Sequence, residues 1–222
     1  DVPAVAIEQC HRVVCKMAGI ASQSLKDSLV IAGDYDKELA AKIVSDEDKV
    51  DRYEDMLGNY LVKLSTKSLS NEDRAITAEL LHLIGDFERI SDHAVNILES
   101  VEEMRDKKIK FSEGAQKELT VMGGAVFEIL DLALDAFRTN DARKAELIEP
   151  LEEVVDRLKE ELRKRHIYRL QKGECTIEMG FILNDLLNNY SRISDHCSNV
   201  AVAVIEVEHN SFDTHKYLND VK

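Results

Sequence analysis

The sequence contains no tryptophan, only two prolines (Pro3 and Pro150) and nine glycines among its 222 residues. Proline and glycine interrupt helices more strongly than any other residue, so their scarcity favours long helices. The rest of the composition is rich in Ala, Leu, Glu, Lys, Asp and Ile, which is also typical of a helical protein. A chain of this length forms either one domain or two small ones, and both arrangements bury enough apolar surface to fold unaided.

Cysteine is scarce, and long apolar runs are absent. The four cysteines contain no Cys-x-x-Cys pair, which argues against a disulfide framework or a thiolate zinc site and favours a reducing compartment. No segment approaches the roughly 18 apolar residues that a membrane span requires, and no signal peptide is present. We therefore expect a cytoplasmic location. The chain begins at Asp1 without an initiator Met, which is compatible with excision from a longer protein that carries a membrane domain upstream. In that case it lies at the cytoplasmic face of the inner membrane.

Positive charge is also in deficit. The formal net charge is −14, and no cluster of Lys and Arg in the sequence is large enough to reverse it locally. Such a chain repels nucleic acid and an anionic membrane leaflet. Nucleic acid is therefore excluded as an expected partner.

Apolar residues recur at three- and four-residue spacing between potential breakers, which predicts six helices. The expected helices run from about 4 to 31, from Asp34 or Asp36 to about Leu64, from the turn at 69–73 to about Lys110, from Ser112 to about Phe137, from Asn140 and Asp141 to about Gln171, and from about Cys175 to Glu208. Phe87 and Tyr190 lie on the apolar stripes and are predicted core residues.

Two motifs occur twice in the chain, in the same order. Glu47-x-x-x-Asp51 recurs as Glu152-x-x-x-Asp156 at an offset of 105 residues, and the segment Arg-Ile-Ser-Asp-His at 89–93 recurs unchanged at 192–196, with an Asn three places after each copy. Self-similarity over such an offset indicates a duplicated structural unit. We predict an all-α protein of two tandem three-helix bundles, the first over residues 1–110 and the second over residues 111–222.

The repeated motifs resemble those of PhoU domains, over nearly the whole chain. Segments 1–6 and 60–64 look particularly like the cytoplasmic PhoU-like domain of bacterial sodium/phosphate cotransporters. The resemblance implies a regulatory domain that controls phosphate uptake or phosphate homeostasis. It also implies a phosphate transporter membrane domain or phosphate-signalling proteins as partners, and multinuclear clusters of iron or zinc at the acidic motifs.

The acidic residues of the first half are spaced for a shared cation. Glu47 and Asp51 lie one helical turn apart, as do Glu88 and Asp92, and side chains at this spacing have Cβ atoms about 5–6 Å apart. If the two helices converge, four carboxylates gather, and a bound cation relieves their repulsion. Oxygen ligands favour iron, manganese or magnesium over copper. Together with the resemblance, this predicts a multinuclear carboxylate site for iron, zinc or manganese.

The second half offers a poorer site. Glu152, Asp156 and Asp195 are its predicted ligands, but Ser191 stands where the first half has Glu88. A hydroxyl is a weaker ligand than a carboxylate, so we expect weaker metal binding, or more water among the ligands.

One alternative weakens this interpretation, and two further patterns are not assigned to the site. The acids could form an ordinary solvated surface, paired locally with Arg52, Arg89, Arg157 and Arg192. The histidines at 93 and 196 follow each motif Asp and point about 100° away around the helix, so we interpret them as structural rather than as ligands. The Glu-x-x-His segments at 8–11, 79–82 and 206–209 occupy unrelated places in the two repeats, which indicates coincidence.

Several functions remain open at the level of sequence. The favoured one is the cytoplasmic domain of a sodium/phosphate cotransporter, and the alternative is a stand-alone PhoU-type regulator of phosphate signalling. A metal-dependent hydrolase is disfavoured, because no nucleophile with its base and no phosphate-binding loop is recognisable, so we expect no enzyme. A purely structural helical spacer is a third class. Inorganic phosphate could bind at an exposed metal edge, and the long amphipathic helices are compatible with a homodimer.

Overall fold

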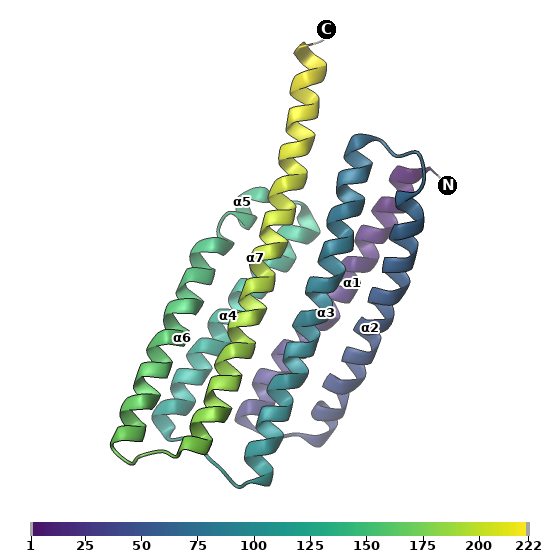
Figure 1. The fold of residues 1–222 in the computed structure, drawn as a ribbon. Helices are drawn as coiled ribbons and strands as arrows, with labels where there is room; N and C mark the ends of the chain where they lie inside the picture. The colour runs from purple at the N-terminus through teal and green to yellow at the C-terminus, as the bar shows by residue number, and fades with distance from the viewer. Residues whose placement is uncertain (1, 221–222) are drawn as a thin grey trace.

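The computed structural model describes residues 2–220, with side chains as far as residue 210. Within this part of the chain all regular structure is helical, which confirms the all-α fold class with three long helices in each half (Figure 1). Residues 1, 221 and 222 of the predicted repeats lie outside the described residues. The helices are α1 (Pro3–Gly33), α2 (Lys37–Ser65), α3 (Asn71–Asp106), α4 (Glu113–Thr139), α5 (Ala142–Ala145), α6 (Ile148–Gln171) and α7 (Ile177–Asp220).

Side-chain caps begin four of the helices. Asp36, Ser70, Ser112 and Asp141 each accept a hydrogen bond from the backbone N–H three residues further on, at 2.8, 3.0, 3.2 and 3.1 Å. Such caps satisfy backbone donors that have no partner within the helix. The choice left open between Asp34 and Asp36 is thereby resolved in favour of Asp36.

Two of the expected helix boundaries are wrong. The helix expected from 141 to 171 is broken into a single turn, α5, and the long helix α6. Pro150 lies in the first turn of α6, where its missing N–H costs little, whereas a continuous helix would place its ring against the carbonyl of Glu146. The last helix continues beyond Glu208 to Asp220, since no glycine or proline follows to end it.

The long helices form two layers (Figure 1). In the view of Figure 1, α6, α7, α3 and α2 lie side by side in front, and α4 and α1 lie behind them. One continuous apolar core extends through both halves, from Ala6 on α1 to Val204 on α7. Phe87 and Tyr190, at equivalent positions of α3 and α7, are both buried in it, as predicted. The division at residue 110 remains a prediction, because the two repeats pack as one body.

A polar contact between α3 and α7 joins the two halves. The imidazole of His93 donates to Asn189 Oδ1 at 2.8 Å, and that of His196 donates to Asp86 Oδ1 at 2.9 Å. The two imidazole rings are stacked with their centroids 5.6 Å apart. The repeated Asn residues add bonds from Asn96 Nδ2 to Asn189 Oδ1 and from Asn199 Nδ2 to Asp86 Oδ1. The repeated His and Asn therefore have a structural role at the joint between the halves.

Candidate metal centres

Three predicted acids of the first half meet between α2 and α3. Glu47 and Asp51 lie one turn apart on α2, and Asp92 reaches them from α3. One carboxylate oxygen of each residue lies within 4.8 Å of the other two, a separation that a single ion can bridge. Glu47 and Asp92 are partly buried and Asp51 is exposed, so the group opens to solvent on one side. We call these residues the first triad.

Glu88 lies beside the first triad rather than within it. Its carboxyl group is hydrogen-bonded to Asp92, one turn further along α3. Burial, and then the neighbouring carboxylate of Asp92, raise the pKa of Glu88 to about 8. A carboxyl group with this pKa retains its proton at neutral pH unless a cation replaces it.

The sequence analysis missed Glu54, which extends the acidic group along α2. Burial and the charges of Asp51, Asp55 and Asp92 raise the pKa of Glu54. The residue facing it on α3 is Gly85, where a Cβ atom would lie 3.9 Å from Glu54 Oε1. The spacing of seven residues from Glu47 places Glu54 on the same helix face, a signal that could have identified it.

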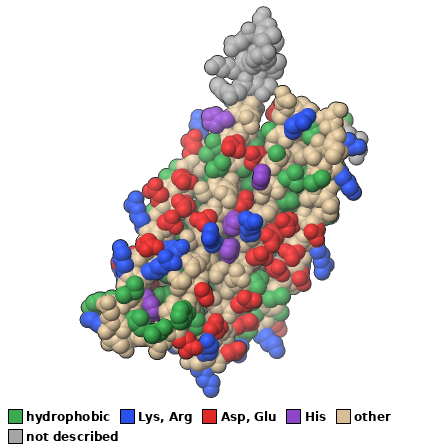
Figure 2. All heavy atoms as spheres, viewed as in Figure 1, with side chains coloured by type: hydrophobic (Ala, Val, Ile, Leu, Met, Phe, Trp, Pro, Cys, Tyr) green, Lys and Arg blue, Asp and Glu red, His purple; other side chains and the backbone are tan. Residues whose placement is uncertain are grey.

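Burial and mutual repulsion both act on the carboxylates of the first triad. Burial is the largest cause of the raised pKa of Glu47, followed by the charges of Asp51 and Asp92. The pKa of Asp51 is raised in the same way, by burial and then by Asp92. Figure 2 shows acidic side chains gathered over α2 and α3. Converging carboxylates of this kind fit a hard or borderline cation, which would offset their charge and use their oxygens as ligands.

The equivalent acids of the second half meet between α6 and α7. Oxygens of Glu152, Asp156 and Asp195 also lie within 4.8 Å of one another, and we call them the second triad. Burial, and then the charge of Asp156, raise the pKa of Glu152 to about 7. Beside this triad lies an open hollow of about 470 Å³, lined by Asp156, Lys159, Asn188, Ser191, Arg192 and Asp195.

The neighbouring arginines do not neutralise the first triad. Among the described residues, no ion pair joins Arg52 or Arg89 to an acid, although the charge of Arg89 lowers the pKa of Glu54 in part. In the second half Arg192 pairs with Asp195 at 3.5 Å, and Arg157 pairs with Glu153, outside the triad. Local salt bridges therefore account for part of the second group and for little of the first.

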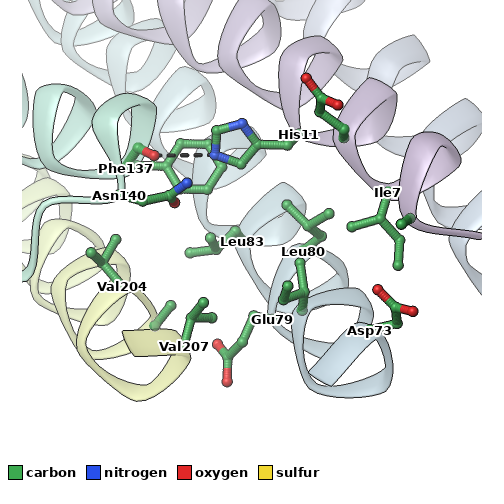
Figure 3. Close-up of a pocket in the computed structure, with 14 residues that line it drawn as sticks. Ile7, His11, Asp73, Glu79, Leu80, Leu83, Phe137, Asn140, Val204 and Val207 are labelled. Atoms are coloured by element: carbon green, nitrogen blue, oxygen red, sulfur yellow. Dashed lines mark hydrogen bonds between the residues drawn. The ribbon is translucent and has the colours of Figure 1, made fainter. Parts of the chain in front are cut away.

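A separate cavity of about 280 Å³ lies between α1, α3, α4 and α7, and its walls are mostly apolar (Figure 3). His11 is held there by a hydrogen bond from Nε2 to the carbonyl of Phe137 at 3.1 Å. Burial, and then a hydrogen bond to Glu206, raise the pKa of Glu79 to about 7. Among the described residues, no group of three ligating side chains is found at this cavity.

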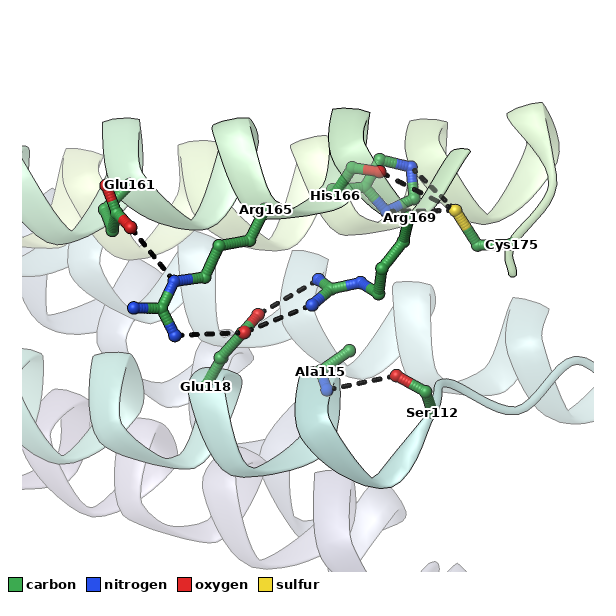
Figure 4. A network of polar contacts seen from close by, with 8 residues as sticks. All are labelled: Ser112, Ala115, Glu118, Glu161, Arg165, His166, Arg169 and Cys175. Atoms are coloured by element: carbon green, nitrogen blue, oxygen red, sulfur yellow. Dashed lines mark hydrogen bonds and ion pairs between the residues drawn. The ribbon is translucent and has the colours of Figure 1, made fainter. Parts of the chain in front are cut away.

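The second half fixes α6 against α4 through Glu118 (Figure 4). Its two carboxylate oxygens accept hydrogen bonds from Arg169 at 3.1 and 3.0 Å, and Arg165 approaches at 3.4 Å. Nearby, Cys175 Sγ lies 3.7 Å from Nδ1 of His166. Burial raises the pKa of the Cys175 thiol, so this cysteine is not an activated thiolate.

The sequence matches the PhoU domain twice, over residues 14–101 and 119–204. Each match contains one of the two triads. The chain belongs to the PhoU family. The duplication predicted from the repeated motifs is thus the tandem arrangement of two PhoU domains.

Relatives within the PhoU family include the phosphate-specific transport system accessory protein PhoU homolog 1 of Thermotoga maritima, 26% identical over 197 residues, or 88% of this chain and 84% of that protein. The accessory protein PhoU of Escherichia coli is 24% identical over 198 residues, or 87% of this chain and 80% of that protein. These relatives carry the names of accessory proteins. They do not support the narrower prediction of a sodium/phosphate cotransporter domain.

Solved PhoU structures share the fold. PhoU from Pseudomonas aeruginosa superposes with a TM-score of 0.85 at 22% identity, covering 93% of this chain and 99% of that one. The phosphate transport system regulatory protein PhoU from Streptococcus pneumoniae gives a TM-score of 0.83 at 19% identity, covering 93% and 96%. Within the described part of this chain, no helix combines the length and apolar character needed to cross a bilayer.

Proposed function

We propose that this chain is an accessory regulator of phosphate transport whose two acidic triads bind metal ions. The observation that carries the proposal is the recurrence of a converged carboxylate triad at equivalent places in both PhoU domains. Solvated surface charge has no reason to recur with the same geometry and the same neighbours. Iron, zinc and manganese are the proposed ions, because a carboxylate donor set suits hard and borderline cations.

A stand-alone accessory protein is favoured over a cotransporter domain and over a hydrolase. The chain covers at least four-fifths of the length of the two relatives described above, and both are named as accessory proteins of phosphate-specific transport. The proposed partners are therefore phosphate transport or phosphate-signalling proteins, in the compartment on the cytoplasmic side of the membrane.

Inorganic phosphate is a candidate ligand of the metal-loaded protein. Asp51 and Asp156 are the exposed members of their triads, so an ion held there has a side open to solvent. The acidic surface repels phosphate, and a multivalent cation would reverse the field at that point. The role of the protein side chains is to hold the ion in place. Packing of α2 on α3 and of α6 on α7 fixes the position of each carboxylate.

Metal content of the purified protein tests the proposal. We expect the wild type, stripped with a chelator and reloaded with Mn²⁺, Fe²⁺ or Zn²⁺, to retain metal after gel filtration, as measured by inductively coupled plasma mass spectrometry. The pair Asp51→Asn and Asp92→Asn should lose the metal of the first half, because two of three ligands become amides.

A matched control replaces two exposed acids outside the triads, Asp131→Asn and Asp185→Asn, and should retain the wild-type metal content. Phosphate uptake by cells that express each form supplies the functional readout. The triad variant should fail to regulate uptake while the control succeeds. A wild type that retains no metal, or a triad variant that retains all of it, would refute the proposal.

A further inference from the structure

The hollow beside the second triad is lined by side chains that donate hydrogen bonds, and two of them are positively charged. Lys159 lines it from α6, and Asn188, Ser191 and Arg192 line it from α7. We call these four residues the donor set. The hollow has a volume of about 470 Å³, whereas a water molecule occupies roughly 30 Å³, so a phosphate ion fits there with its waters. Lysine, arginine and neutral donors are the groups that bind phosphate oxygens in proteins.

The bonds that join the donor set to the second triad are weak. Lys159 Nζ donates to Ser191 Oγ at 3.3 Å, and Ser191 Oγ donates to Asp156 Oδ1 at 3.3 Å. Both are longer than the usual range, about 2.7–3.2 Å for N–H donors and about 2.5–3.0 Å for O–H donors, so a stronger acceptor can replace them. Among the described residues Lys159 forms no ion pair, which leaves its charge available to a ligand in the hollow.

Asn188 is oriented by an arginine on α6. Arg163 Nη2 donates to Asn188 Oδ1 at 2.9 Å and to Asn184 Oδ1 at 2.9 Å. A guanidinium group can only donate hydrogen bonds, so Asn188 turns its amide oxygen toward Arg163. The NH2 group of Asn188 then remains as the donor that it offers to the hollow. Arg163 is therefore a positioning residue for the donor set.

The first half lacks this arrangement. Of the donor set and the two residues that orient it, only Arg192 has the same residue, Arg89, at the equivalent position. Offsets of 105 and 103 residues between the repeats give the other five equivalents, which are Glu54, Gly58, Leu81, Gly85 and Glu88. Two carboxyl groups thus stand where the second half has an ammonium group and a hydroxyl group. Figure 2 shows Lys and Arg side chains among the acids over α6 and α7, whereas acids predominate over α2 and α3.

A divalent ion would balance the charge of the second centre but not that of the first. Glu149, whose equivalent in the first half is Val44, adds a fourth carboxylate to the second triad at the end away from the hollow. These four carboxylates are balanced by a divalent ion together with Lys159 and Arg192. In the first centre, five carboxyl groups face a divalent ion and Arg89 alone, so a formal charge of −2 remains. That charge repels phosphate from the first half.

We infer that the hollow is a phosphate-binding site of the second half, in which the donor set binds the phosphate oxygens next to an ion of the second triad. This inference rests on the proposed metal binding and narrows it, since both triads hold metal but only the second also binds phosphate. An ion alone accepts any anion, whereas the donor set adds directed hydrogen bonds. The ligand is a phosphate group, either as the free ion or on a side chain of a partner protein.

Phosphate binding by the Mn²⁺-loaded protein tests the inference. Equilibrium dialysis with radiolabelled inorganic phosphate should reveal a single site per chain. Lys159→Gln and Asn188→Ala each remove one donor and leave the triad in place. Each should weaken phosphate binding by about tenfold, the loss expected for a hydrogen bond that involves a charged group. Mass spectrometry should show that both variants retain the Mn²⁺ content of the wild type.

The matched controls remove the same charges outside the hollow. Lys164→Gln takes an exposed ammonium group from α6, and Arg89→Gln takes the exposed guanidinium group beside the first triad. Both should keep the phosphate affinity of the wild type, whereas Arg192→Gln, the counterpart of Arg89→Gln, should weaken it. Circular dichroism confirms that each variant is helical.

The coupling between metal and phosphate gives a second measurement. Because such coupling is reciprocal, phosphate should tighten Mn²⁺ binding at the second triad and leave the first unchanged. Isothermal titration of two proteins, each with the opposite triad converted to amides, separates the halves.

Two probes distinguish the sources of the phosphate group. Tighter binding of inorganic phosphate than of a short phosphoserine peptide identifies the free ion as the ligand. Tighter binding of the peptide, without binding of its unphosphorylated form, identifies a phosphorylated side chain of a partner.

The outcomes also separate the inference from the proposed function. Unchanged phosphate binding in Lys159→Gln and Asn188→Ala proteins that retain Mn²⁺, or equal coupling to phosphate in both halves, would overturn the inference and leave metal binding intact. A wild type that binds neither Mn²⁺ nor phosphate would overturn both.

Discussion

The two halves of the molecule share a backbone plan but differ in how buried and how charged their polar contacts are. At the joint between α3 and α7, the contact around Asp86 is buried and carries a carboxylate. Its counterpart around Asn189 is partly exposed and carries an amide. The same divergence appears beside the triads, where Glu54 and Glu88 of the first half correspond to Lys159 and Ser191 of the second. The two halves share their helix packing and differ in the charge that equivalent positions carry.

The largest expected effect concerns the buried side of this joint. Asp86→Ala leaves His196 and Asn199 without their acceptor, and should lower the free energy of unfolding by about 3 kcal/mol, because unsatisfied buried polar groups are costly. Asn189→Ala removes the equivalent acceptor from a more exposed site and should cost about 1 kcal/mol. Urea unfolding measures both.

An isosteric variant sharpens the same comparison. Asp86→Asn gives the buried contact the chemistry of its exposed counterpart while keeping an acceptor for His196. It should lower the free energy of unfolding by less than Asp86→Ala does. If the alanine variants at 86 and 189 lose the same free energy of unfolding, burial does not make one contact more stabilising than the other.

The next effect concerns the salt bridge that joins the first and middle helices of each half. In the second half, both partners of the Arg169–Glu118 pair are largely buried, with side chains 12% and 15% exposed, whereas in the first half Asp27 is 9% exposed but its partner Lys42 is 47% exposed. Glu118→Gln removes the buried charge and should lower the free energy of unfolding by about 2 kcal/mol.

The control for this substitution lies on the same helix. Glu113 forms an exposed pair with Lys117, and Glu113→Gln should change the free energy of unfolding by less than about 0.5 kcal/mol. If both variants unfold at the same urea concentration, the contact shown in Figure 4 does not stabilise the second half.

The smallest effect concerns the acid that the second half has gained. Glu149→Gln should weaken metal binding at the second triad by about tenfold, the lower end of the range for residues that support metal ligands. Binding at the first triad should not change, since its equivalent position is Val44. Isothermal titration of a protein whose first triad has been converted to amides isolates the second site. An unchanged affinity would place Glu149 outside the centre.

Much of the fold follows from local sequence signals. Breakers and caps located six long helices, and the cap at Ser112 was anticipated together with its helix. The split between α5 and α6 was missed because Pro150 lies at a position that a helix start tolerates, so that its effect on the preceding turn was overlooked. The C-terminal end of α7 was placed too early because its apolar pattern fades without a glycine or proline to mark the end of the helix.

The sequence predicted some residues of the candidate centres and missed others. The repeated spacing of Glu47, Asp51 and Asp92 was enough to anticipate that they converge, and the structure places them together. Metal binding itself stays a prediction. Glu54 was missed although its spacing of seven residues from Glu47 places it on the same helix face. That the charges of Asp51 and Asp92 act on Glu54 is visible only in the packed structure.

The order Asp-His in each repeated motif has a mechanical consequence. Asp92 and His93 are adjacent and point about 100° apart around α3, so that one faces its own triad and the other faces Asn189 of the opposite half. A rotation of α3 that withdraws Asp92 from its triad therefore also withdraws His93 from Asn189. The same relation holds for Asp195 and His196 on α7. A rotation of α3 or α7 at its triad is therefore transmitted to the opposite half.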